Sequence, residues 1–377
     1  MRTVIIRINS NFLPDTYDNS VNMRSIFRIK AWVILLVIAF VGVSRSNNRN
    51  SNSVSVTEHQ TEAQVSTYDE TEDHVERSRY RVFDTNGNRT NIDELISVVK
   101  SVDVTFIGEI HTDATAHHLE ALLLEKTWDK WQTLSLEMFE TDVQYVLDEY
   151  MTGHINEEHF LKSARSWENY GSDYRKLIEF SKEKGTSVIA ANAPRRYVNM
   201  VRRMGKNSLL NLPEEGKRFL PPLPVPEASS EYEKKFKAIM TAHHSMINMV
   251  TDDPEGEISQ KNSNSNSVDS KIEESNIIDL GAFERMLAAQ NLWDASMAWS
   301  IASHLEKNSK NRVLHVNGSF HTDFSLGIPE QLNNYSPNLD LLIVTIVPSL
   351  DYPNFRDSMI GLGDYIIITD GKIEASH

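Results

Sequence analysis

Four segments of the sequence carry histidine, carboxylate or amide side chains close together. They are 108–111 (Gly-Glu-Ile-His), 137–140 (Glu-Met-Phe-Glu), 192–195 (Asn-Ala-Pro-Arg) and 317–321 (Asn-Gly-Ser-Phe-His). Imidazoles and carboxylates bind divalent cations, and they also transfer protons in hydrolytic reactions. The chain has no cysteine, so a metal would need His, carboxylate, Tyr or water as its ligands. These segments therefore indicate a cation site or acid–base chemistry.

Each of the four segments overlaps or directly follows the end of a run of residues typical of a β-strand. In open α/β sheets, ligands bind beyond the carboxyl ends of the strands. We therefore predict that four side chains meet in one crevice: Glu109, His111, Glu137 and His321. The two histidines and Glu137 would bind a divalent ion and leave positions open for water. In a hydrolase, Glu109 or Glu137 would act as the general base.

Further candidates lie near these strand ends. We expect His118 to face inward, because it precedes Leu122 by about one turn of a helix, and we expect His117 to point to the flank. Gln290 and Asp294 lie four residues apart on the apolar stripe of a long predicted helix. Buried polar groups need partners, so we expect these two to reach the strand ends.

Asn192 and Arg195 follow the third predicted strand. Glu137 lies among apolar neighbours, so a metal, Arg195 or a protonated histidine must compensate its charge. Glu140 lies further out, and we expect it to be solvated. For all these residues an interpretation without a site stays open, in which they cap helices or form ordinary hydrogen bonds.

Strand and helix patterns alternate along the chain. The predicted strands are 102–110, 133–140, 186–194, 312–321, 339–348 and 364–369. The predicted helices include 115–131, 143–151, 157–184 with a break near 170–171, and 280–307. Short, nearly continuous apolar strands are typical of sheets covered on both faces. We predict an α/β fold with a mainly parallel sheet flanked by helices and a smaller helical insertion lobe.

Composition divides the chain into four parts. Residues 1–46 form a signal peptide or N-terminal anchor, 47–76 a disordered linker, 77–195 and 281–377 the α/β core domain, and 196–280 a helical lobe with a disordered insertion at 251–275. The two predicted disordered stretches are rich in Ser and Asn and poor in apolar residues.

The N-terminal segment predicts export. Basic residues precede the apolar run AWVILLVIAFVGV at 31–43, and small or polar residues follow it, as in a secretory signal. An uncleaved membrane anchor is the alternative, and a start at Met23 would give a more usual signal length. Either way, we expect the remainder to lie in the periplasm or cell envelope. The formal net charge of −15 disfavours nucleic acid as a partner.

Common catalytic signatures are missing from the sequence. It contains no P-loop, GxGxxG, HExxH or GxSxG motif. Nucleotide binding, zincin proteolysis and α/β-hydrolase chemistry therefore have no support.

The chain contains, in this order, GEIHTDATAHH, LEMFE, ANAPR, QNLWDASMA and VNGSFHTD. This ordered set resembles the ChaN-like haem-binding uptake proteins, whose superfamily includes Tiki proteases and erythromycin esterases, over about residues 80–350. The resemblance implies a parallel α/β core with a helical lobe, export, and haem-iron acquisition. The GxxH signature of the superfamily corresponds to Gly108 and His111, its downstream counterpart to Gly318 and His321, and its second-strand glutamate to Glu137. Without cysteine, the lipid anchor common among ChaN-like proteins is excluded.

Three hypotheses about function follow. The first is an exported haem- or iron-binding protein of the ChaN-like type, acting in haem-iron uptake. Its expected cofactor-binding residues are His111, His118, Asn192, Arg195, Gln290, Asp294 and His321, and conceivable tyrosine ligands of the iron are Tyr80, Tyr170, Tyr174 and Tyr197. The second is a metal-dependent protease or esterase at the same site. The third is a helper protein that keeps the pocket without using it.

The expected partners follow from the same hypotheses. They are haem or another small molecule, a membrane reached through the N-terminal segment, and a second copy of the chain in a homodimer.

Overall fold

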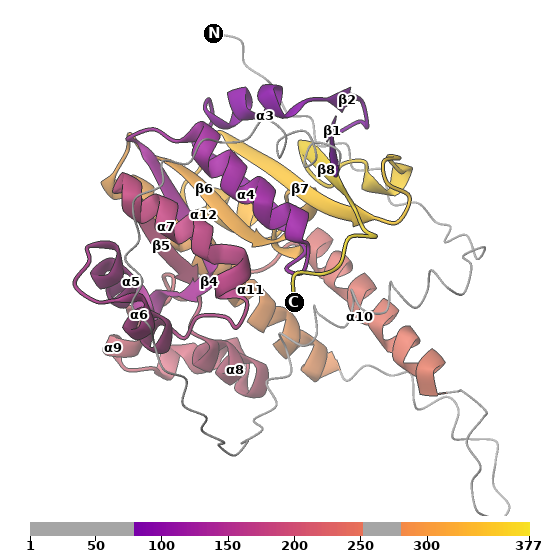
Figure 1. Ribbon diagram of the computed structural model, residues 1–377. Helices are drawn as coiled ribbons and strands as arrows, with labels where there is room; N and C mark the ends of the chain where they lie inside the picture. Colours follow the sequence, from indigo (N-terminus) through magenta and orange to yellow (C-terminus); the bar gives the residue numbers. More distant parts are fainter. Residues whose placement is uncertain (1–78, 252–279) are drawn as a thin grey trace, which may run out of the picture. The chain divides into compact units, whose positions relative to one another are not determined.

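The computed structural model describes residues 79–251 and 280–377 (Figure 1). The predicted segments 1–46 and 47–76, and residues 252–275 of the predicted insertion, lie outside the described residues. The described residues divide between two units, with 79–236 and 280–377 in the first and 237–251 in the second. The sheet and all predicted site residues belong to the first unit. The division into core domain and lobe stays a prediction.

A single eight-stranded sheet forms the centre of the first unit, in the order β2-β1-β8-β7-β3-β6-β4-β5. The strands from β8 to β5 are parallel, whereas β1 and β2 pair antiparallel at one edge. The bounds are β1 Tyr80–Asp84, β2 Arg89–Thr90, β3 Val104–Glu109, β4 Gln132–Glu140, β5 Ser187–Asn192, β6 Arg312–Gly318, β7 Leu341–Ser349 and β8 Tyr365–Asp370. The predicted class, an α/β fold with a mainly parallel sheet, is confirmed.

Helices cover both faces of this sheet (Figure 1). Because side chains alternate along a strand, Phe106 and Ile107 of β3 point to opposite faces. Ile107 packs in a cluster with Leu119 of α4, and Phe106 packs in another with Ile301 of α11. Each buried side chain of this size contributes about 1.5–3 kcal/mol to the free energy of folding. The two clusters therefore fix the helices on either side of the sheet.

The helices of the first unit vary widely in length. Their bounds are α3 Ile92–Val99, α4 Ala114–Thr127, α5 Gln144–Met151, α6 Glu157–Ala164, α7 Arg175–Lys184, α8 Arg195–Met204, α9 Glu214–Lys217, α11 Leu280–Lys307 and α12 Ile328–Tyr335. Helix α10 (Ser230–Thr251) begins in the first unit and ends in the second. A π-helix at Tyr170–Tyr174 precedes α7, where the sequence predicts a break.

The sequence analysis missed several short elements. Strands β1 and β2 and helices α3 and α12 are not among its predictions, and each has at most eight residues. The longer elements all lie close to their predicted positions, and α11 has the predicted bounds.

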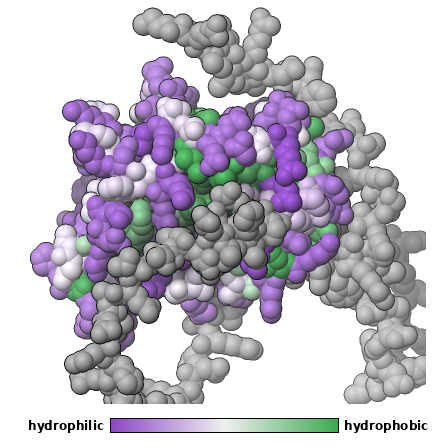
Figure 2. Space-filling view, turned by 45° about the horizontal axis from the view of Figure 1, so that its top comes forward, coloured by the Kyte–Doolittle hydropathy of each residue, from purple (hydrophilic) through white to green (hydrophobic). Residues whose placement is uncertain are grey.

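Strand β5 forms the second edge of the sheet, and a side chain covers part of it. The Gln144 amide donates to the Val188 carbonyl at 2.8 Å, and its oxygen accepts from the Ala190 N–H at 2.7 Å. These bonds imitate a neighbouring strand and protect the edge from pairing with another chain. On the face seen in Figure 2, hydrophilic residues surround a smaller area of hydrophobic ones. No helix within residues 79–251 and 280–377 is long and apolar enough to cross a lipid bilayer.

Candidate functional site

The candidate site lies at the carboxyl ends of β3, β6 and β4, three neighbouring strands. Glu109 is the last residue of β3 and pairs in register with Gly318, the last residue of β6. In β4, the pairing with β5 becomes irregular between Leu136 and Glu140, and Glu137 lies in that stretch. An irregularity of this kind re-aims side chains. It lets the Glu137 carboxylate reach the end of β6, where its Oε2 accepts from the Gly318 N–H at 2.7 Å.

The first part of the site is a pair formed by Glu109 and His111. Glu109 is 1% exposed, and its Oε1 accepts from the Tyr174 hydroxyl at 2.7 Å and from His111 Nδ1 at 2.9 Å. Burial opposes the charge of Glu109, but His111 and His117 hold the pKa of this carboxyl well below its usual range. The ionised Glu109 carboxylate therefore holds the imidazole of His111 in a fixed orientation.

The His111 ring is the more open part of this pair. Its side chain is 30% exposed, and the edge of Trp167 packs against it with ring centroids 5.0 Å apart. Burial lowers the pKa of His111, but Glu109 and Glu137 outweigh burial and raise it above its usual value. With Nδ1 held by a carboxylate, the neutral ring presents Nε2 as a base or as a metal ligand.

The second part is a pair formed by His321 and Asp294. His321 Nδ1 lies 2.5 Å from Asp294 Oδ1, and the Gln290 amide nitrogen lies 3.4 Å from His321 Nε2. Asp294 is fully buried and Gln290 is 2% exposed. Burial lowers the pKa of His321, but the charges of Glu137 and Asp294 raise it above its usual value. Helix α11 thus supplies the partners of the strand-end histidine.

Glu137 lies between the two pairs. Its Oε1 is 3.6 Å from His321 Nε2. A methyl group at Gly318 would lie 2.9 Å from His111 Nε2 and 3.7 Å from Glu137 Oε2, so glycine is required for this close approach. The structure therefore brings Glu109, His111, Glu137 and His321 together, each histidine oriented by its own carboxylate.

The assignment of the two adjacent histidines on α4 needs a correction. His117, predicted to point to the flank, is 6% exposed and lies 2.8 Å from Glu109 Oε2, whereas His118 is only half-buried. The reason is the rotation of α4: Glu120 and Leu124 lie on its buried side, while Leu122, the basis of the prediction, is half-buried beside His118.

Two further residues of this cluster, Glu120 and Asp173, escaped the sequence analysis as site members, whereas Tyr174 was considered there only as a ligand of haem iron. Glu120 is fully buried, and Asp173 and Tyr174 belong to the π-helix that precedes α7. Asp173 Oδ1 lies 3.4 Å from His117 Nδ1. Although burial lowers the pKa of His117, its contacts with Asp173 and Glu109 raise it to about 11. The i, i+3 spacing of His117 and Glu120 is the signal that could have indicated their shared face.

Asn192 and Arg195 lie farther out. The Asn192 side chain accepts from the Ala193 N–H at 2.8 Å. Arg195, whose side chain is 66% exposed, has its Nε 3.7 Å from Glu140 Oε1 and its guanidinium 5.8 Å from the centre of the Trp167 ring. Of the three partners considered for Glu137, Arg195 instead pairs with Glu140, and a histidine, His321, lies 3.6 Å from Glu137.

The spacing of possible metal ligands singles out one group. Among the residues that the structure describes, Glu109, His117 and Glu120 are the group of three whose donor atoms all lie within 4.8 Å of one another. The predicted set of His111, Glu137 and His321 does not meet this spacing. Metal binding by that set stays a prediction.

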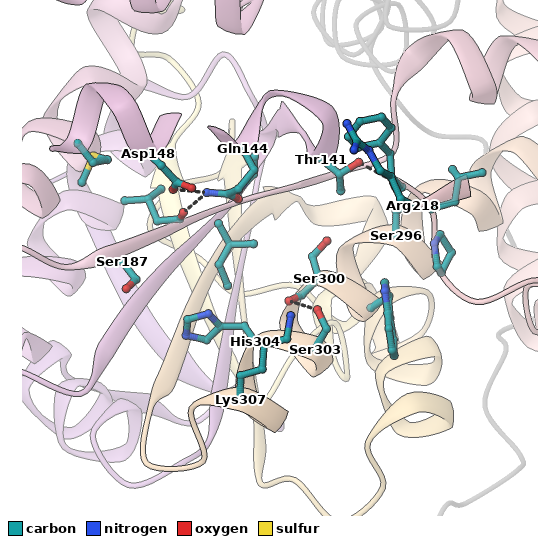
Figure 3. A pocket seen from close by; sticks show the side chains of 18 of the residues that line it. Thr141, Gln144, Asp148, Ser187, Arg218, Ser296, Ser300, Ser303, His304 and Lys307 are labelled. Carbon is teal, nitrogen blue, oxygen red and sulfur yellow. Dashed lines mark hydrogen bonds between the residues drawn. The ribbon is translucent and has the colours of Figure 1, made fainter. Parts of the chain in front are cut away.

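A surface pocket lies apart from the histidine–carboxylate site. It has a volume of about 600 Å³ and runs along β5, between α5 and the C-terminal half of α11 (Figure 3). Thr141, Asp148, Ser300 and Lys307 are among the polar residues that line it, and none of the predicted site residues does. This pocket lacks the paired histidines and carboxylates, so it is not part of the candidate functional site.

Fold and side-chain geometry together define an α/β protein with a cluster of histidines and carboxylates at the carboxyl ends of its strands. More narrowly, the chain belongs to the family described as "Haem-binding uptake, Tiki superfamily, ChaN", which matches residues 95–332. The resemblance noted from the motifs is confirmed. No curated protein matches the sequence.

One solved structure shows the likeness in fold, and a second is a weaker match. The structure described as cofacial haem binding to ChaN of Campylobacter jejuni has a TM-score of 0.54 and 16% identity, covering 78% of this chain and 98% of that chain. A mutant of the erythromycin esterase EreC in its open conformation has a TM-score of 0.37 and 10% identity, covering 77% of this chain and 83% of that chain.

Proposed function

We propose that this chain is a haem-binding protein in which His111 faces the haem iron. The observation that carries the proposal is exposure: the His111 side chain is 30% exposed, against 8% for His321 and 6% for His117. Because haem is bulky, the side chain that binds its iron must be accessible from the protein surface. Of these three imidazoles, His111 meets that condition best.

The surroundings of His111 fit a haem. Imidazole is a common axial ligand, and a carboxylate on its other nitrogen fixes the ring and raises its basicity. Glu109 fulfils this role at 2.9 Å. Trp167 offers an aromatic surface beside the ring, and the exposed guanidinium of Arg195 lies next to Trp167, where it would pair with a haem propionate. Haem iron bound here would carry the redox and ligand chemistry, while these residues hold and orient it.

We further propose that the protein is exported and serves haem-iron uptake. The description of its family and the signal-like segment at 31–43 support this role. Cofacial haem binding is described for ChaN of Campylobacter jejuni, and it supports a homodimer here, in which two chains would bring two haems together. Membrane association through the N-terminal segment belongs to the same proposal.

Haem titration of the full chain tests the proposal. We expect a Soret band that shifts on binding, and an affinity that falls about tenfold or more in His111→Ala. The exposed His154 provides a matched control, and His154→Ala should bind like the unchanged protein. Equal affinities of all three proteins would show that the iron is held elsewhere.

A hydrolase is the second candidate, and one observation favours it. Glu137 borders two imidazoles, and both have their Nδ1 held by a carboxylate. Such an arrangement can move a proton to or from a bound water or substrate. If the protein is a hydrolase, His321→Ala abolishes turnover of ester or peptide substrates. If it is only a haem carrier, the unchanged protein shows no turnover.

A further inference from the structure

A second cluster of ionisable side chains lies behind His111, on the interior side of Glu109. Helix α4 packs over the sheet that contains β3 (Figure 1). From this helix, His117 and Glu120 approach the Glu109 carboxylate. The exposed fractions are 0% for Glu120, 1% for Glu109 and 6% for His117. These residues therefore form an interior group that is distinct from the open face of His111.

The bonding of Glu109 leaves one of its oxygens available to this group. Oε1 accepts from Tyr174 and His111, whereas Oε2 has no hydrogen bond and lies 2.8 Å from His117 Nε2. Because the His117 nitrogens also lack hydrogen-bonded partners, this is a short contact without hydrogen-bond alignment. Glu109 Oε2 and His117 Nε2 can both act as ligands of a metal cation.

Glu120 provides the independent sign of a missing ligand. It is fully buried, and neither of its carboxylate oxygens has a hydrogen-bond partner. An isolated buried carboxylate is strongly unfavourable unless a cation or a proton compensates it. One oxygen of Glu120 lies within 4.8 Å of a carboxylate oxygen of Glu109 and a ring nitrogen of His117, so the Glu120 carboxylate points into this cluster.

We propose that Glu109, His117 and Glu120 bind a divalent transition-metal cation. One imidazole and two carboxylates form a ligand set that suits zinc or manganese. Metal-bound histidines almost always donate their other N–H to a carboxylate, and Asp173 is the candidate for this role, with its Oδ1 3.4 Å from His117 Nδ1 but no hydrogen bond between them. The cation would be structural, since it joins α4 to the end of β3. The proposal does not depend on haem binding, although the two sites share Glu109.

A proton is the competing occupant. Without a cation, burial and the neighbouring charge of Glu109 raise the pKa of Glu120 and so favour its protonated form. Glu120→Gln separates the two cases because it keeps the shape of a protonated carboxyl and removes a metal ligand. Glu125→Gln, at a half-buried position of the same helix, is the matched control.

Zinc retention after refolding is the test. The full chain is unfolded in guanidinium with a chelator and refolded with or without Zn²⁺, so that burial does not prevent loading. Haem is left out, so the result is independent of haem binding. In the unchanged protein and in Glu125→Gln, we expect one zinc per chain after desalting. We also expect their midpoint of thermal unfolding to be several degrees higher after refolding with Zn²⁺ than after refolding without it. Glu120→Gln should fold by circular dichroism yet lose at least tenfold in zinc affinity.

Two results would overturn the proposal. One is an unchanged protein that retains no zinc and shows no shift in its midpoint. The other is Glu120→Gln retaining as much zinc as the unchanged protein, which would place the metal elsewhere. If Glu120→Gln does not fold, His117→Asn takes its place, with His118→Asn as control and the same two criteria.

Discussion

Gly318→Ala is a minimal change at the centre of the candidate site. The added methyl group would lie 2.9 Å from His111 Nε2, whereas non-bonded contacts of this kind settle at roughly 3.5 Å. The backbone of Gly318 has φ −61°, so alanine adds no backbone strain. The His111 ring must therefore move by roughly 0.6 Å, against the Glu109 carboxylate and the edge of Trp167. Overpacking of this size costs about 1–3 kcal/mol.

If His111 ligates the iron, that cost appears in haem affinity. A loss of about 1–3 kcal/mol corresponds to a dissociation constant roughly 5- to 150-fold higher in a Soret titration. Gly171→Ala is the control, because a methyl group there has no heavy atom within 4 Å. Circular dichroism verifies that both variants fold. A Gly318→Ala protein that folds and binds haem as tightly as Gly171→Ala would refute the position assigned to His111.

Three further predictions concern the free energy of unfolding, measured by urea titration. Burial lowers the pKa of His315 to about 3, whereas the unfolded chain takes up this proton near pH 6.5. Stability therefore falls by about 1.4 kcal/mol per pH unit from this group as the pH drops from about 6.5 toward 3, and His315→Gln should remove that slope. Tyr174→Phe should lower stability by about 1–3 kcal/mol, because the charged Glu109 carboxylate loses the hydrogen bond that the Tyr174 hydroxyl donates. His117→Gln should destabilise the chain more than His118→Gln, since His117 is buried at ion-pair distance from the carboxylates of Glu109 and Asp173, whereas His118 is half-buried; equal losses would contradict this.

The position of the site could be predicted from the sequence because topology decides it. Parallel strands bring their carboxyl ends to one edge of a sheet, so residues that follow separate strands meet there. Glu109 and Gly318 are neighbours for this reason, although more than 200 residues separate them. The buried Gln290 and Asp294 could likewise be placed, because polar residues on the apolar stripe of a helix need a partner.

The identity of individual contacts could not be predicted, because packing fixes it. The choice between His117 and His118 depends on a rotation of α4 that the apolar pattern defines only roughly. Tyr174 reaches Glu109 because a π-helix precedes α7, and periodicity predicts only that the helix breaks there. The irregular pairing of β4 similarly decides where Glu137 points, and its strand pattern carries no sign of it.

Electron paramagnetic resonance of the ferric haem complex, with ¹⁵N-labelled histidine in the full chain, tests most directly whether His111 holds the iron. We predict a hyperfine coupling from a histidine nitrogen to the iron that disappears in His111→Gln and persists in His154→Gln. A spectrum without histidine coupling, or one that His111→Gln leaves unchanged, would contradict the assignment of His111 as the ligand.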